Sequence, residues 1–77
     1  MFKLFEKSII KKKIKKAKKN IEMLEKKRAR SQAALVTAIL SQQTPADDDV
    51  EYFNHFTGLI ETERNRMHSL MKDLEQL

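Results

Sequence analysis

Apolar residues in the first half of the chain have the spacing of a long helix with one apolar seam. From residue 10 to residue 42, apolar or small residues recur at alternating intervals of three and four, as at Ile14, Ala17 and Ile21, with Arg28 and Gln42 as the exceptions. This heptad spacing places them on one face of a helix and is typical of coiled coils. The pattern therefore predicts a helix whose seam a second element must cover.

The second half of the chain carries the same spacing, at Phe53, Phe56, Ile60 and Met67 among other positions. Such a repeat predicts a second helix with a seam of its own. Two helices of this kind can cover each other, and the fold class that follows is all-α. The composition agrees, since one glycine, one proline and 35% charged residues are typical of a mostly helical chain.

A turn between the two helices is expected at residues 43–46. Thr44 can cap the second helix, Pro45 fits its first turn without needing an N–H partner, and Asp47 stands at the capping-box position. The first helix is then expected to end near Gln43. Because so short a connection joins antiparallel neighbours, the sequence predicts an antiparallel two-helix coiled-coil hairpin.

The two seams match in a register that places Ile14 opposite Leu77. This register divides the chain into a basic amphipathic overhang, residues 1–13, and the hairpin proper, residues 14–77. Nothing in the hairpin is expected to cover the apolar side chains of the overhang, which are Phe2, Leu4, Phe5 and Ile9.

The same register brings the charged residues of the two seams together. It places Arg28 opposite Glu63 and, beside the seam, Glu25 near Arg64. A polar layer of this kind usually contributes more to register than to stability. We expect these four residues to form a polar layer that sets the register.

Charge is unevenly distributed along the chain, whose net charge is +5. Residues 1–43 hold 13 Lys or Arg against 3 Glu, whereas residues 44–77 hold 3 Lys or Arg against 8 acidic residues. Part of this asymmetry favours pairing of a basic helix with an acidic one. The excess positive charge lies in the N-terminal third.

Seven of the nine residues from 11 to 19 are lysines, which we call the lysine belt. They spread over about 220 degrees of the helix surface, leaving only the seam free. Such a belt fits an acidic protein, nucleic acid, anionic lipid or a nuclear-localisation signal, and it also fits a face that simply keeps the protein soluble. Base-specific reading is not expected, because no aromatic residue is interleaved with the lysines. The belt consists of Lys11, Lys12, Lys13, Lys15, Lys16, Lys18 and Lys19.

A second apolar face of the first helix lies opposite the seam. Since the second helix can cover only one side of the first, this face requires another partner. Its small residues allow close approach of a helix, and we expect two hairpins to dimerise into a helical bundle. The face consists of Ala29, Ala33, Val36 and Leu40.

Several kinds of chemistry are not expected. The chain has no Cys, no glycine-rich phosphate loop and no nucleophile with an obvious base. Asp47, Asp48 and Asp49 lack the spacing and glycine of a calcium loop, and we expect His55 and His68 to be surface residues. The sequence therefore predicts neither an enzyme nor a site for a metal, a cofactor or a small-molecule substrate.

The predicted function is that of a non-catalytic helical interaction module: an adaptor, regulator or inhibitor. Its basic residues and exposed apolar faces are expected to bind an acidic protein, and the chain is expected to bind a second copy of itself. A nonspecific nucleic-acid-binding protein is the alternative, and a peripheral membrane-surface protein is the third possibility. Lacking a recognisable signal peptide and any run of about 20 apolar residues, the chain is expected in the cytoplasm.

Overall fold

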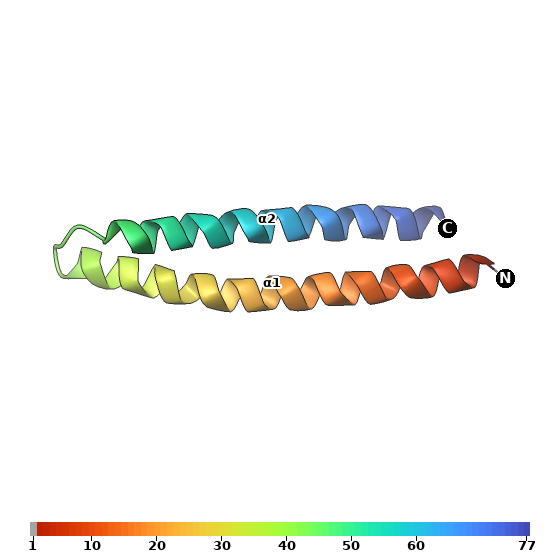
Figure 1. The fold of residues 1–77 in the computed structure, drawn as a ribbon, viewed down its shortest axis with the longest axis horizontal. Helices are drawn as coiled ribbons and strands as arrows, with labels where there is room; N and C mark the ends of the chain where they lie inside the picture. Colours follow the sequence, from red (N-terminus) through yellow and green to blue (C-terminus); the bar gives the residue numbers. More distant parts are fainter. Residues whose placement is uncertain (1) are drawn as a thin grey trace.

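Two long antiparallel helices make up the fold (Figure 1). The computed structural model describes the backbone of residues 2–77 and the side chains of residues 3–77. Helix α1 spans Phe2–Leu40 and helix α2 spans Asp47–Gln76, and together they form a rod of 62 × 16 × 14 Å. The predicted all-α hairpin is confirmed.

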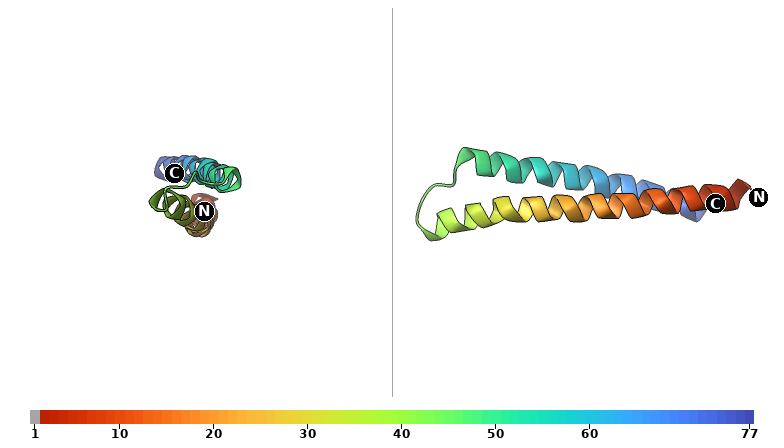
Figure 2. Two further views of the ribbon diagram at one scale, coloured as in Figure 1. Left: turned by 90° about the vertical axis from the view of Figure 1, so that its left-hand side faces the viewer. Right: turned by 60° about the horizontal axis from the view of Figure 1, so that its bottom comes forward.

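The two helices pack against each other. In Figure 2 they lie apart at the turn in one view and overlap toward the termini, as two long helices do when they cross at a shallow angle. The core lies on the predicted seams, since the buried apolar residues are Ile14, Ala17, Ile21 and Ile60. Ile60 is the most deeply buried, with 1% of its surface exposed. The core is therefore one side chain thick.

The register differs from the predicted one by about one helical turn. The end of α2 lies beside Ile10, because Ile10 and Leu77 line the same groove. Leu24 likewise shares a groove with Glu63, and not with a residue one turn further along α2. The turn explains the shift: α1 ends at Leu40 and α2 begins at Asp47, so these two ends face each other.

The first helix ends earlier than expected because Gln42 adopts a left-handed conformation, with φ of 56°. The N–H of Gln43 donates to the carbonyl of Ala38 at 2.8 Å, and the N–H of Gln42 donates to that of Ile39 at 3.0 Å. This pair of bonds is a Schellman motif, which closes the end of a helix. Glycine usually occupies such a left-handed position, because residues with a Cβ adopt it at a steric cost. Here the residue is Gln42, so no glycine in the sequence marks this end of the helix.

The second helix begins two residues later than expected. Its N-cap is Ala46 and not Thr44, and the Ala46 side chain makes no capping hydrogen bond. The prediction of a Thr44 cap is therefore wrong. Three acidic residues, Asp47, Asp48 and Asp49, occupy the first turn of α2, where they interact favourably with the helix dipole.

Candidate interaction surface

The lysine belt lies on α1, and all seven of its side chains are exposed. Two residues within this stretch, Ile14 and Ala17, are buried against α2. They hold this part of α1 to the rest of the hairpin, so the lysines occupy the remaining circumference. The belt is thus a fixed helical surface.

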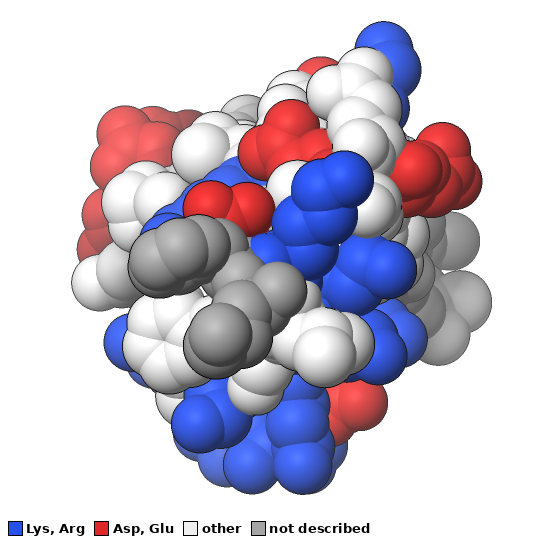
Figure 3. Space-filling view, turned by 90° about the vertical axis from the view of Figure 1, so that its right-hand side faces the viewer, with Lys and Arg blue, Asp and Glu red and all other residues white. Residues whose placement is uncertain are grey.

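No described side chain forms an ion pair with the lysine belt. Among the side chains of residues 3–77, the ion pairs are Arg64 with Glu25 at 2.9 Å and Arg66 with Glu63 at 4.0 Å. Neither pair contains a lysine. Residues 2–19 together with residues 68–77, which form the open end of the hairpin, hold ten lysines against three carboxylates. Figure 3 looks at this end and shows most of the basic side chains gathered on the α1 side.

Apolar side chains are exposed at the same end of the molecule. Leu4 is 75% exposed and Phe5 is 68% exposed, and we call these two residues the apolar tip. Ile9 is less exposed, at 38%, because it lines a groove with Leu77. The side chain of Phe2 lies outside the described residues. The uncovered stretch of α1 is therefore shorter than residues 1–13, the stretch that the sequence predicts.

The apolar tip and the lysine belt share one continuous surface. A shallow groove on α1 is lined by Leu4 together with Lys7, Lys11, Lys12 and Lys15, among other residues. The apolar part of Leu4 thus lies beside the alkyl stems of lysines whose ammonium groups can reach into solvent. A partner that covers Leu4 would also meet these charges.

The second apolar face is exposed, as the sequence predicts. Ala29, Ala33, Val36 and Leu40 are all exposed, and near the turn Ile39 extends this apolar surface. Within the described chain, nothing covers these side chains. Coverage by a second copy stays a prediction.

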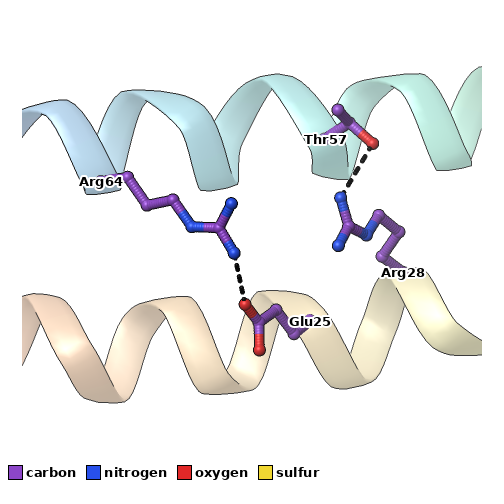
Figure 4. Close-up of polar contacts among 4 residues, drawn as sticks. All are labelled: Glu25, Arg28, Thr57 and Arg64. Carbon is purple, nitrogen blue, oxygen red and sulfur yellow. Dashed lines mark hydrogen bonds and ion pairs between the residues drawn. The ribbon is translucent and has the colours of Figure 1, made fainter.

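Figure 4 shows the polar contacts between the helices. Glu25 and Arg64 form the salt bridge already given, both half-exposed, and the sequence places them side by side. The predicted pairing of Arg28 with Glu63 is wrong. Arg28 instead donates from Nη1 to the hydroxyl oxygen of Thr57 at 3.4 Å, and its guanidinium lies 5.7 Å from the centre of the Phe53 ring.

The shift of one turn explains this change of partners, because it carries Glu63 past Arg28 to the position beside Leu24. There, Glu63 Oε1 reaches only Arg66 of its own helix, and Oε2 is buried without a hydrogen-bond partner. Thr57 and Phe53 are not predictable from the sequence as partners of Arg28, because only the register of the two helices brings them beside it.

Other kinds of site find no support in the described part of the chain. No three His, Cys, Asp or Glu side chains of these residues come together as metal ligands would. Neither α1 nor α2 contains an apolar stretch of the length that a bilayer span requires.

Comparisons with known protein families, curated proteins and solved structures return no match to this chain. The features of the chain that indicate a function are therefore its exposed lysines and its exposed apolar side chains. These lie in two places, the open end of the hairpin and the outer face of α1 near the turn.

Proposed function

We propose that this chain is a non-catalytic interaction module, of the adaptor or regulator kind, that binds an anionic macromolecular surface through residues 3–19 of α1. One observation carries the proposal: seven exposed lysines lie within nine residues, and none of them takes part in an ion pair with the described part of the chain. Like charges held this close on a fixed helix repel one another. A partner that supplies negative charge relieves this repulsion and releases the counterions that the lysines hold.

Two further features favour binding over a merely solvated face. The first turn of α1 carries no acidic residue, so the partial positive charge at this end of the helix adds to that of the lysines. The apolar tip, Leu4 and Phe5, is exposed beside them. A role in keeping the protein soluble would explain the exposed lysines. It would not explain large apolar side chains that are exposed next to them.

The proposal is tested by removing four charges from the belt, in the variant Lys11→Gln, Lys12→Gln, Lys15→Gln and Lys16→Gln. A matched control removes four exposed charges outside the open end, in the variant Lys26→Gln, Lys27→Gln, Arg30→Gln and Arg66→Gln. Both variants have the same net charge, and far-ultraviolet circular dichroism checks that both keep their helices.

The binding probes are duplex DNA, polyglutamate and phosphatidylserine vesicles. We expect the wild-type chain to bind at least one anionic probe and the belt variant to lose most of that affinity. The control variant should keep most of it. Equal losses in the two variants would show that binding follows net charge and that no dedicated surface exists.

A further inference from the structure

The type of cation in the belt distinguishes among anionic partners. All seven charges are lysines, whereas the four arginines lie at Arg28, Arg30, Arg64 and Arg66. Arginine has a planar fork that matches individual carboxylates and phosphates, and it is the usual choice for recognition of a defined partner. Lysine is a compact, flexible point charge. A belt built of lysine alone suits a diffuse layer of negative charge.

The arrangement of the lysines around the helix indicates how such a layer is approached. A nucleic-acid duplex lying along α1 would contact only one face of the helix. The lysines on the other faces would make no contact with it. The belt instead occupies every side of α1 except the seam with α2. Lysines on different sides of a helix meet one flat surface together when the helix approaches it end first.

The order of residues along α1 fits this approach quantitatively. The apolar tip comes first, and Lys11 and Lys12 follow about 10 Å further along the axis, at 1.5 Å per residue. Apolar faces of membrane-surface helices enter a bilayer by about 5–10 Å, to the boundary of headgroups and acyl chains. A tip inserted to that depth places Lys11 and Lys12 at the level of the lipid phosphates.

We infer that the anionic surface is a bilayer containing anionic phospholipid, which the apolar tip enters while Lys11 and Lys12, the lysines of the belt nearest to the tip, lie at the headgroups. This inference rests on the proposed function and names the partner's class. The groove shared by Leu4, Lys7, Lys11 and Lys12 supports it, since lysine stems beside an apolar side chain can extend from the acyl boundary to the phosphates.

Two pairs of lysines provide the test because they lie on the same faces of α1, one heptad apart. Lys11 and Lys12 form the near pair, and Lys18 and Lys19 form the far pair. A lysine at an anionic surface contributes about fivefold to partitioning, so the variant Lys11→Gln with Lys12→Gln should weaken binding to phosphatidylserine vesicles by about 25-fold. The far pair lies about 10 Å higher, beyond a Debye length of about 8 Å, and its replacement should weaken binding only about two- to threefold.

Insertion of the tip is tested separately with a fluorescent reporter, since the chain has no Trp. In Phe5→Trp the emission should shift to shorter wavelength when vesicles of phosphatidylcholine with phosphatidylserine are added. Leu40→Trp is the matched control, because Leu40 is 79% exposed at the opposite end of the rod. Its emission should not respond to the vesicles, and vesicles of phosphatidylcholine alone should shift neither reporter.

The outcomes separate this inference from the proposed function. Equal losses from the near and far pairs, or a vesicle response at Leu40→Trp, would overturn entry by the open end. Lysine-dependent binding to duplex DNA or polyglutamate without binding to vesicles would overturn the inference that the partner is a lipid bilayer. The proposed function would then still hold. Binding to none of the three probes would overturn both.

Discussion

Glu63 occupies a seam position of α2 that an apolar residue would fill better. Its side chain is only 20% exposed, and its Oε2 is buried with no hydrogen-bond partner. Its one ionic contact, to Arg66, is long at 4.0 Å and involves an exposed guanidinium. Leu24 and Leu59 line the same groove, so the surroundings of the carboxylate are largely apolar. We therefore expect Glu63→Leu to stabilise the hairpin.

The magnitude follows from two contributions. A buried polar atom without a partner costs about 1–3 kcal/mol, and replacing buried charged groups with apolar ones stabilises proteins by up to about 4 kcal/mol. Since 20% of the Glu63 side chain still meets water, we expect a gain of about 2 kcal/mol in the free energy of unfolding. For a domain of this size, that gain corresponds to a rise of roughly 8–16 °C in Tm. Glu63→Gln keeps a polar atom in the same place and should gain much less.

Urea and thermal unfolding followed by circular dichroism measure this effect. Glu61→Leu is the matched control, because Glu61 is a neighbouring glutamate of α2 whose side chain is exposed. It should change the free energy of unfolding by no more than about 0.5 kcal/mol, as surface substitutions usually do. If Glu63→Leu gives no gain, or no more than Glu61→Leu, then Glu63 does not lie buried beside Leu24 and the observed register is refuted.

Four other changes test the fold and the second apolar face. Ile60→Ala should lower the free energy of unfolding by about 2–5 kcal/mol in urea titrations, because Ile60 is the most deeply buried side chain. Gln42→Gly should raise Tm through a gain of about 1 kcal/mol, since glycine adopts the left-handed conformation freely; a lower Tm would contradict the Schellman ending of α1. Ala46→Asp should also gain about 1 kcal/mol in thermal unfolding by supplying the missing N-cap acceptor, whereas Ala46→Gly should gain less. Val36→Glu should halve the mass measured by light scattering at micromolar concentration, and a wild-type chain that is already monomeric there would refute dimerisation.

Periodicity alone predicts which residues form the seam. Ile14, Ala17, Ile21 and Ile60 lie where the heptads place them, since the intervals of three and four leave only one face for burial. The register of the two helices does not follow from periodicity. Sliding one helix past the other by a turn keeps apolar residues facing apolar residues, and the apolar pattern therefore tolerates both arrangements.

The register depends on where α1 ends, and its ending is not visible in the sequence. Gln42 takes the left-handed position that glycine or asparagine usually marks, so no residue signals the end at Leu40. The prediction of Arg28 opposite Glu63 failed for this reason. Exposure of the lysine belt was predictable because it depends only on which face of α1 the lysines occupy, whereas the partial cover of Ile9 depends on the register.

The length of the rod has a consequence for anything that holds the molecule by one end. With a long axis of 62 Å, the turn lies several Debye lengths away from the open end, so charges at the two ends do not influence each other in physiological salt. A molecule bound by its open end would project away from the surface that binds it. Asp47, Asp48 and Asp49 would then lie far from that surface. The apolar side chains of Ile39 and Leu40 would then be presented at that height, accessible to a second molecule whatever the charge of the surface below.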